Sequence, residues 1–529
     1  MASMGPDEFR SIVDKSRAEH PGATLAVPIS VRLLEDQLTP VLAYRRLVAQ
    51  DDRTAPSFLL ESVEGGERQG RHSIIGAQPV VEVIAHAHDV RTIDHRDNSS
   101  SVRREDNPLF VARELTRSFR LITDGRSDLP DCVLGGWGGH ASYDTVRYAE
   151  PGKLDTGSAP PDDRHLPDVH FSLYDGVVAF DHVDKLVHVV QLAFVAPGAD
   201  PRGAYEEARV RLESRVEQIQ RHARPLPAGR VSEDADVEPM ASNITREQHA
   251  EMVARAKEHI AAGDIFQVVV GQRFVRTSEV DPFDVYRALR TVNPSPYMVY
   301  MQSEGCILVA SSPEILCRVR KEEAGMVVTN RPLAGTRKRG RTPEEDTSLE
   351  SELLADQKEV AEHVMLVDLG RNDVGRVAVP GTVTLEKVME IERYSHVMHI
   401  SSTVTGVLRD GLDCWDALRA ALPVGTISGA PKVRAMQIID DLEPIRRGPY
   451  GGGMGYVGLD GQMDIALALR TIVVPTNQHR AGKWTYHVQA AGGIVADSLA
   501  EDEYMETVNK AAALGRAIDV AEHAFGVEP

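Results

Sequence analysis

Five short segments in the second half of the chain combine polar or ionisable side chains with small residues, in most cases glycine. They are residues 332–336 (PLAGT), 368–373 (DLGRND), 395–399 (SHVMH), 423–432 (PVGTISGAPK) and 489–498 (QAAGGIVADS). Small residues on either side of a hydroxyl or amide allow backbone N–H groups to converge on an anion. One such segment is a weak signal, because a Gly-Thr pair is usually a turn. Together they indicate a site for an anionic ligand.

Two charged positions in this half allow both a structural and a functional interpretation. Arg470 stands inside an apolar stretch, residues 464–472, that is typical of a strand. A buried arginine is costly without an anion, so this one is either at a solvated strand edge or in contact with a carboxylate. Glu506 precedes Lys510 by four residues on the expected last helix, where an exposed ion pair is the ordinary interpretation.

His399 and Glu314 are similarly ambiguous when taken alone. His399 stands among Val397, Met398 and Ile400, where a histidine is most often a satisfied core residue. Glu314 follows the end of an expected strand. Without a functional role, Glu314 is interpreted as a carboxylate at a helix N-terminus, where the helix dipole stabilises its negative charge.

Two familiar motifs are excluded by their context. Residues 453–458 match G-x-G-x-x-G, but residues 459–461 form a turn toward another strand instead of opening a helix, so no dinucleotide site is expected. In residues 425–429 (GTISG) the serine comes one place too late for a nucleophile elbow. No Walker A sequence is present.

The elements that must position these residues can be outlined from periodicity. A helix is expected over residues 202–220, followed by a Pro-, Gly- and charge-rich linker over 221–243. Thr245 and Gln248 form a capping box that starts the next helix, which runs to Ala262 with Gly263 as its stop. We therefore divide the chain at about residue 240.

The remaining pattern predicts an α/β or α+β fold with large sheets. Strands are expected at residues 80–84, 176–180, 187–192, 265–270, 297–302, 307–310 and 465–474. A helix is expected over 351–369, with Leu354, Val360, Val364 and Val367 in its apolar stripe and Glu362 among its residues. Residues 503–510 belong to the last helix.

Composition excludes several classes of protein. The chain has 529 residues and a formal net charge of −20, which argues against nucleic-acid binding. Its four cysteines show no C-x-x-C spacing, so a reducing cytoplasm is expected. The N-terminus does not read as a secretory signal, and no apolar run approaches the ~20 residues that cross a bilayer. We expect neither a nucleic-acid nor a membrane partner.

The five segments, in this order, resemble those of the chorismate-utilising enzymes. With the N-terminal features, residues 25–520 resemble the anthranilate synthase component I family. The resemblance implies a large two-part α/β sandwich. It implies an N-terminal extension (1–24), a regulatory part that binds tryptophan (25–220), the linker (221–243) and a catalytic part that binds chorismate (244–520), which also contributes residues 293–298 to the regulatory site.

The resemblance also implies roles for individual residues. Glu362 and Glu506 would bind Mg²⁺, which prefers few carboxylates completed by water and substrate oxygen. Arg470 would hold the enolpyruvyl carboxylate, His399 would assist the loss of pyruvate, and Glu314 would help the 4-hydroxyl to leave. The other expected pocket residues are Gln267, Gly335, Thr336, Thr426, Tyr450, Ala491, Gly492, Gly493 and Lys510.

Two positions distinguish relatives that use different nucleophiles. Isochorismate and salicylate synthases carry a lysine where this chain has Gln267, and an amide cannot activate water as a base. Aminodeoxychorismate synthases carry a lysine nucleophile where this chain has Ala334. Free ammonia is therefore the expected nucleophile and anthranilate the expected product, in the first step of tryptophan biosynthesis. Aminodeoxychorismate synthase component I and a non-catalytic paralogue that binds tryptophan or chorismate remain the alternatives.

Further segments match the family's tryptophan feedback site. They contain Glu61 and Ser62 in residues 59–62, and Asn293, Pro294, Pro296, Tyr297 and Met298 in residues 293–298. Residues 70–73 (GRHS) depart from the usual GRYS. No cysteine stands in a Gly-x-Cys-x-Gly elbow, so a separate glutamine amidotransferase subunit, and hence a hetero-oligomer, is expected to supply ammonia.

Overall fold

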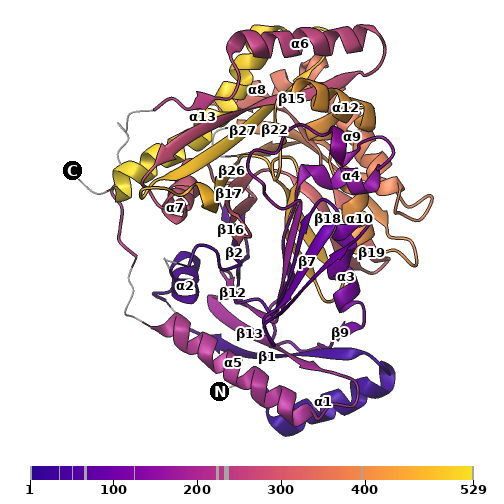
Figure 1. Ribbon diagram of the computed structural model, residues 1–529, viewed down its shortest axis with the longest axis vertical. Coiled ribbons are helices and arrows are strands. Elements are labelled where there is room, and N and C mark those ends of the chain that lie inside the picture. The colour runs from indigo at the N-terminus through magenta and orange to yellow at the C-terminus, as the bar shows by residue number, and fades with distance from the viewer. Residues whose placement is uncertain are drawn as a thin grey trace.

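The computed structural model describes residues 3–34, 36–49, 52–64, 68–123, 125–221, 226–231, 238–394 and 397–526. Within these ranges the chain forms two large, mostly antiparallel sheets and the helices that cover them (Figure 1). The α/β or α+β fold class expected from the sequence is confirmed. None of the helices in this described part is long and apolar enough to cross a membrane.

The first sheet has 13 strands drawn from both halves of the chain. In spatial order they are β14 (Ala241–Ser242), β15 (Gln267–Ser278), β27 (Trp484–Ile494), β26 (Thr471–Pro475), β17 (Cys306–Ser312), β16 (Tyr297–Ser303), β2 (Ser57–Glu61), β5 (His72–Ala77), β12 (Gly176–Asp181), β13 (Leu186–Val195), β1 (Thr24–Leu33) and β9 (Phe119–Leu121), with β23 (Gly429–Ala430) also paired to β15.

The second sheet has 12 strands, again from both halves. Their order is β20 (Leu333–Lys338), β22 (Val397–Val407), β19 (Gly325–Asn330), β18 (Ile315–Glu322), β25 (Met463–Leu467), β24 (Gly453–Gly458), β10 (Gly136–Ala141), β11 (Val169–Tyr174), β6 (Val81–His86), β7 (Asp89–Asp94) and β8 (Ser99–Arg104), with β21 (Thr384–Arg393) paired to β22. A separate hairpin joins β3 (Val63–Glu64) and β4 (Arg68–Gln69).

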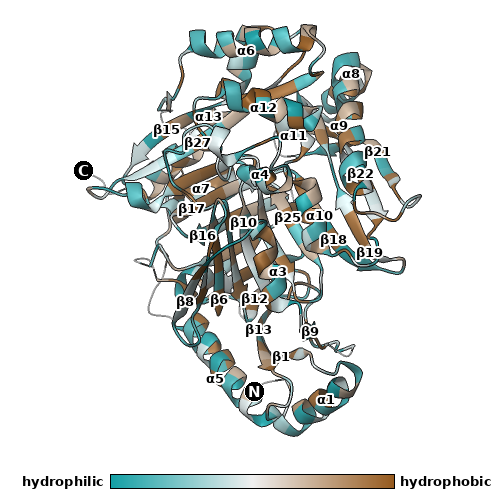
Figure 2. Ribbon diagram, turned by 45° about the vertical axis from the view of Figure 1, so that its right-hand side comes forward, coloured by the Kyte–Doolittle hydropathy of each residue, from teal (hydrophilic) through white to brown (hydrophobic). Residues whose placement is uncertain are grey.

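The helices lie on the outer faces and at the ends of the sheets. They are α1 (Pro6–Glu19), α2 (Pro40–Leu47), α3 (Val111–Thr116), α4 (Val146–Ala149), α5 (Pro201–Gln220), α6 (Arg246–Ala261), α7 (Pro282–Val292), α8 (Pro343–Ala355), α9 (Gln357–Gly375), α10 (Cys414–Ala421), α11 (Gly425–Ser428), α12 (Lys432–Leu442) and α13 (Ala500–Phe525). Figure 2 shows the hydrophobic strands grouped in the middle of the molecule, with hydrophilic residues on α6 at one end and on α1 and α5 at the other.

The inner faces of the two sheets pack directly against each other. Phe58 of β2 and Tyr174 of β11 meet edge to face, with ring centroids 4.9 Å apart. Gly76 and Gly138 leave room for the Phe58 ring, because a Cβ on either would come within 2.4 Å of a ring carbon. Burial of these apolar side chains stabilises the sandwich by about 25 cal/mol per Å².

The chain crosses from one sheet to the other at two neighbouring places. At the first crossing, β17 ends in the 13-stranded sheet and β18 begins in the other, so Glu314 lies between the sheets. At the second, residues 468–470 connect β25 to β26 in the reverse direction. Backbone hydrogen bonds join the two crossings: the N–H of Leu467 donates to the carbonyl of Glu314 (3.0 Å), and that of Ser311 to the carbonyl of Arg470 (3.1 Å).

Two sequence predictions are corrected here. The single strand over 465–474 is wrong, because β25 and β26 belong to different sheets and Arg470, at φ +46°, lies in the crossing between them. The single helix over 351–369 is also wrong. It breaks at Asp356, whose carboxylate caps α9 by accepting hydrogen bonds from the N–H groups of Lys358 and Glu359. The apolar stripe does not continue across this break, and Leu354 and Val364 are 40% and 44% exposed.

Other sequence predictions are confirmed. Helix α5 matches the expected 202–220. Helix α6 begins with the expected capping box of Thr245 and Gln248, and Gly263 follows it at φ +80°. Strands β24 and β25 form a hairpin, so residues 453–458 do not open a helix.

The division at about residue 240 stays a prediction, although both sheets run across it. The expected linker contributes β14 near its end, and its residues 222–225 and 232–237 lie outside the described ranges.

Candidate active site

The expected site residues gather at the ends of the two sheets where β15 and β27 of one lie near β20 and β22 of the other. Helices α9 and α13 lie at the same end of the molecule (Figure 1). Glu314 and Arg470 come from the two crossings. The site is therefore walled by both sheets.

Glu314 is a buried acid, 2% exposed. Thr426 in α11 donates a 2.8 Å hydrogen bond to its Oε1. Burial raises the pKa of Glu314 to about 8, and the Thr426 hydrogen bond opposes that shift. The carboxyl is mostly protonated at neutral pH, so it can give a proton to a departing oxygen. The alternative of a helix N-terminal carboxylate is wrong, because a strand follows Glu314.

Arg470 is a cation that lacks an anion. Burial lowers its pKa, and Tyr394 opposes that shift. Among the described residues no carboxylate forms an ion pair with it. Its left-handed φ of +46° is costly for a residue other than glycine and is the kind of strain found at ligand sites. The uncompensated guanidinium indicates an anionic ligand.

His399 of β22 is held as a neutral base. Its Nδ1 lies 2.9 Å from the carbonyl oxygen of Gly335 and 3.1 Å from the Thr336 hydroxyl. The carbonyl can only accept, so Nδ1 carries the hydrogen and Nε2 has the lone pair. Nε2 is buried and has no partner in the part of the chain that the structure describes. Burial lowers the pKa of His399 to about 4, and the charges of Arg470 and Lys510 add to this.

Gly335 is positioned by a bulge in β20 opposite β22 and has φ +70°. A Cβ there would come within about 3.3 Å of Leu353, Ile400 and the carboxylate of Glu359. Glycine at this position therefore lets the backbone carbonyl face His399.

Gln267 begins β15 and connects the two sides of the site. Its Nε2 donates a 2.9 Å hydrogen bond to Oε1 of Glu362 on α9. Its own Oε1 is buried and has no partner in the described structure. A Cβ on Gly493 would come within 2.6 Å of Gln267 Nε2 and 3.5 Å of Glu362 Oε1. The glycine thus allows the amide and the carboxylate to meet beside β27.

The second expected metal ligand, Glu506, lies near Gly492, which precedes Gly493 on β27. A Cβ on Gly492 would be 3.9 Å from Glu506 Oε2 and 3.1 Å from Glu503 Oε2. The ion pair offered as the structural alternative is present: Lys510 Nζ lies 2.6 Å from Glu506 Oε1, with both side chains about half exposed. Lys510 also donates to the carbonyl of Ala491 (2.9 Å), so it faces the site.

Tyr450 completes this wall. It is 3% exposed, and its phenol lies within hydrogen-bonding reach of the Ala491 backbone. Burial raises the pKa of Tyr450, so its hydroxyl stays protonated.

Glu359 and Glu503 are site residues that the sequence analysis missed. Burial raises the pKa of both, and the neighbouring Glu362 and Glu506, respectively, raise it further. Each precedes its neighbour by three residues on one helix. Two such Glu pairs on separate helices were a sequence signal that could have identified them.

The site's chemistry fits a magnesium ion. No set of three or more His, Cys, Asp or Glu side chains in the described part of the chain is arranged to hold a metal by itself. Magnesium, however, binds through one or two carboxylates plus water and substrate oxygens. The neighbouring carboxylates on α9 and α13 provide oxygen donors whose mutual repulsion a cation would relieve. The buried Oε2 of Glu503 has no hydrogen-bond partner among the described residues. Glu362 and Glu506 remain the predicted ligands.

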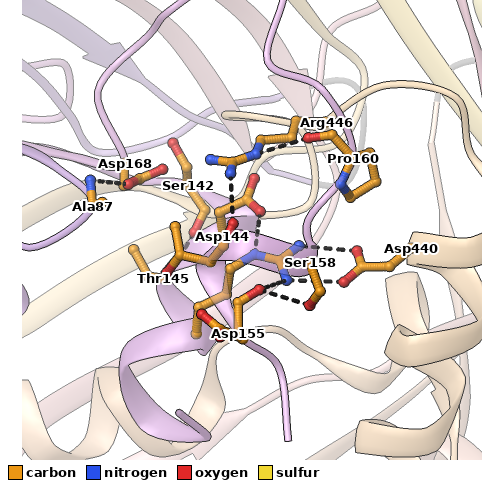
Figure 3. Close-up of polar contacts among 12 residues, drawn as sticks. Ala87, Ser142, Asp144, Thr145, Asp155, Ser158, Pro160, Asp168, Asp440 and Arg446 are labelled. Carbon is orange, nitrogen blue, oxygen red and sulfur yellow. Dashed lines mark hydrogen bonds and ion pairs between the residues drawn. The ribbon is translucent and has the colours of Figure 1, made fainter.

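The segment containing Thr426 is anchored from the N-terminal half. Arg147 pairs with Asp144 (2.8 Å) and, through both Nη atoms, with Asp440 of α12 (2.9 Å each). Figure 3 shows Asp144 and Asp440 approaching from opposite segments, with Arg446 bonded to Pro160 nearby. Helix α12 directly follows residues 425–431. This network therefore ties α12, the helix that follows the Thr426 segment, to the N-terminal half of the chain.

The two expected regulatory segments lie side by side in the 13-stranded sheet. Glu61, the last residue of β2, pairs with Met298 of β16. The Glu61 carboxylate accepts hydrogen bonds from the Tyr286 hydroxyl (2.7 Å) and Arg290 (3.0 Å). The N–H of Val63, next to Ser62, donates to the carbonyl of Ser295.

The other expected residues of this region are also close. Asn293 is the C-cap of α7. The Tyr297 hydroxyl donates a 2.9 Å hydrogen bond to Asp464 of β25. Pro294 and Pro296 lie on either side of Ser295 in the chain. The structure thus brings both segments together. Tryptophan binding there stays a prediction, as do the catalytic and metal-binding roles above. Ser395 and His396 of the 395–399 segment lie outside the described residues.

Comparisons with known proteins agree with this geometry. The sequence profile described as chorismate binding enzyme matches residues 55–516. The chain therefore belongs to the chorismate binding enzyme family.

Several of the proteins it resembles are named anthranilate synthase alpha subunit or component I. It is 52% identical to anthranilate synthase alpha subunit 1, chloroplastic, of Arabidopsis thaliana, over 99% of this chain and 90% of that protein. It is 53% identical to the corresponding subunit of Oryza sativa subsp. indica, over 94% and 89%. The crystal structure of anthranilate synthase component I from Streptococcus pneumoniae TIGR4 superposes with a TM-score of 0.68 at 35% identity, covering 92% of this chain and 99% of that one.

Proposed function

We propose that this chain is the large subunit of an anthranilate synthase and converts chorismate and ammonia to anthranilate and pyruvate. The observation that carries the choice of reaction is the Gln267 side chain. Its Nε2 donates a hydrogen bond to Glu362, and its buried Oε1 is an acceptor without a partner among the described residues. Such an oxygen can accept a hydrogen bond from ammonia but cannot deprotonate water.

The neighbouring groups supply binding and proton transfer. Arg470 and Lys510 bind the substrate carboxylates, which an acidic chain of net charge −20 would otherwise repel. Magnesium held by Glu362 and Glu506 would neutralise further carboxylate charge.

The first half-reaction is amination of the ring. The ammonia lone pair forms the C2–N bond as the C4–O bond breaks. Glu314 protonates the departing hydroxyl, which leaves as water, and the new ammonium group returns one proton to the Glu314 carboxylate. The raised pKa of Glu314, about 8, suits this donor role at neutral pH.

The second half-reaction is elimination and aromatisation. Nε2 of His399 takes the proton from C2, the C3–O bond breaks, and the enolpyruvyl group leaves as enolpyruvate, which becomes pyruvate on protonation. The low pKa of His399 keeps this nitrogen unprotonated in the resting site. The ring is then aromatic anthranilate.

Ammonia derived from glutamine would come from a separate amidotransferase subunit, which makes the functional enzyme a hetero-oligomer. Burial raises the pKa of Cys306, Cys317 and Cys414, and that of Cys132 to about 12. None of these thiols is therefore an activated nucleophile for glutamine hydrolysis. Tryptophan would bind at the Glu61 and 293–298 segments and inhibit.

The free cysteines favour a reducing compartment such as the cytoplasm. The two plant relatives are named chloroplastic. Fractionation of the source cells would test this expectation.

The deciding assay incubates the pure chain with chorismate, Mg²⁺ and an ammonium salt at alkaline pH. Anthranilate fluorescence is expected. Isochorismate, salicylate or an unchanged substrate would contradict the proposal. Aminodeoxychorismate without pyruvate would favour the alternative synthase, which Ala334 at the lysine position disfavours.

A substitution tests the nucleophile argument in the same assay. Gln267→Lys is expected to yield some water-derived product, because a lysine there is a base. Gln191→Lys, at a buried glutamine on β13, serves as the control. Anthranilate as the only product of Gln267→Lys would refute the argument from the amide.

A further inference from the structure

Two consecutive buried serines join the regulatory turn to the catalytic crossings. Ser311 and Ser312 end β17, and both are 0% exposed. The Ser311 hydroxyl donates to the carbonyl of Asn293, while its backbone N–H donates to the carbonyl of Arg470 (3.1 Å). One residue thus contacts both the turn before β16 and the substrate-binding arginine.

Ser312 repeats this arrangement toward the other crossing. Its carbonyl accepts a 3.0 Å hydrogen bond from the Ser295 hydroxyl. Its own hydroxyl donates to the carbonyl of Leu467 (2.5 Å) and lies 3.4 Å from the backbone N–H of Glu314, which donates to it. The backbone N–H of Leu467 in turn donates to the Glu314 carbonyl.

These contacts make the two regions mechanically dependent on each other. A buried hydroxyl or carbonyl that loses its partner pays a desolvation penalty, so each hydrogen bond resists separation of its two ends. Residues 293–295 therefore cannot shift without either breaking these bonds or moving the backbone of Arg470 and Glu314. Such a shared element, with two arrangements, is the physical requirement for coupling between sites.

We propose that Ser311 and Ser312 are positioning residues that transmit tryptophan binding at residues 293–298 to Arg470 and Glu314. This rests on the proposed function. A ligand that reorders the turn displaces the Asn293 carbonyl and the Ser295 hydroxyl, and the serines carry that displacement to both crossings. Chorismate binding and tryptophan binding then oppose each other by the same factor.

The test uses the full chain and compares Ser311→Ala and Ser295→Ala with Ser303→Ala. Ser303 is an equally buried serine at the far end of β16, where its hydroxyl contacts His140, so its loss controls for removing any buried hydroxyl. Tryptophan affinity is measured by calorimetry with and without chorismate, in the presence of Mg²⁺ but without ammonia, so that no turnover occurs. Inhibition of anthranilate formation is measured separately.

In the unsubstituted chain and in Ser303→Ala, chorismate is expected to weaken tryptophan binding at least 5-fold. In Ser311→Ala this factor should fall below 2, and tryptophan affinity without chorismate should stay within 2-fold. The tryptophan concentration for half-inhibition should rise at least 10-fold. Ser295→Ala removes the hydrogen bond to the Ser312 carbonyl and should reduce the coupling factor to a similar extent. It provides the test if Ser311→Ala does not fold.

Retention of the full coupling factor in both folded variants would overturn the inference. So would an unsubstituted chain that makes anthranilate but shows no coupling. A chain that makes no anthranilate contradicts the proposed function instead, and the calorimetric coupling still reports on the serines.

Discussion

The hydroxyl of Thr426 donates a hydrogen bond to Oε1 of Glu314 across 2.8 Å. This contact brings the segment before α12 onto the crossing between the two sheets. Thr426 thereby adjusts the acidity of the group that we expect to protonate the leaving hydroxyl.

Removal of the Thr426 hydrogen bond should shift the pH dependence of catalysis. The bond lowers the pKa of Glu314, which burial holds at about 8, so Thr426→Val should raise that pKa further. Because the acid acts while protonated, the loss of kcat on the alkaline side should move to higher pH. The measurement is kcat from pH 6 to 10 at constant free ammonia. Thr116→Val, on the distant α3, should leave the profile unchanged, and a shift to lower pH would contradict the assignment.

Glu314 should also make the fold less stable as pH rises. An unfolded chain releases this proton near pH 4.5, whereas the folded chain keeps it until about pH 8. The contribution to stability is present below pH 4.5 and declines between the two values, by up to about 1.4 kcal/mol per pH unit. Glu314→Gln should therefore flatten the fall in unfolding free energy between pH 5 and 8. Urea denaturation at several pH values measures this, and equal slopes would refute the shifted pKa.

Loss of the His399 base should separate the two half-reactions. His399→Asn removes the free Nε2, so elimination of pyruvate should slow by about 100-fold or more. Amination does not use this nitrogen. The aminated ring that still carries its enolpyruvyl group should accumulate and be detected by mass spectrometry. His487→Asn, at a buried histidine on β27, is the comparison, and equal loss of both steps in His399→Asn would contradict the assigned role.

Arg470 should act mainly on substrate binding. Arg470→Lys keeps the charge but loses the planar pair of N–H groups, so KM for chorismate should rise by about 10- to 100-fold. The change in kcat should be smaller. Arg209→Lys, on the exposed face of α5, should change neither constant. An unchanged KM would place the carboxylate of chorismate elsewhere.

Magnesium dependence should follow the carboxylates of α9 and α13. EDTA should abolish activity and Mg²⁺ should restore it. In Glu362→Gln and Glu506→Gln the Mg²⁺ concentration for half-maximal rate should rise at least about 10-fold, because one of two charged ligands is lost. Glu359→Gln and Glu503→Gln should raise this Mg²⁺ concentration less, if these residues act only through the local charge. Glu207→Gln is the control, and a magnesium requirement that none of the four changes would exclude this site.

The sequence predicted local features better than it predicted the path of the chain. The capping box of Thr245 and Gln248 was recognised because it depends on residues three apart. The break at residues 468–470 was missed, since strands of either sheet are equally apolar and nothing local marks a change of sheet. The break at Asp356 was also missed: its backbone N–H caps the end of α8, and its carboxylate caps the start of α9.

The site shows the same division. Its polar residues were named from the five segments and from the family resemblance, but the contacts between them were not predicted. The contact of Gln267 with Glu362 joins residues 95 positions apart: Gln267 lies on β15 of the 13-stranded sheet, whereas α9 packs on β20 and β22 of the other sheet. Glu359 and Glu503 were overlooked because an acidic residue on a helix is usually solvated.

The pocket is built by two separate sheets, and the two positions that distinguish nucleophiles are divided between them. Position 267 lies on β15 of the 13-stranded sheet and position 334 on β20 of the 12-stranded sheet. We therefore expect a change of nucleophile to require a substitution in one sheet only, while the residues of the other sheet still bind the substrate. Because no strand is shared by the two positions, each can be substituted without altering the backbone hydrogen bonds of the other.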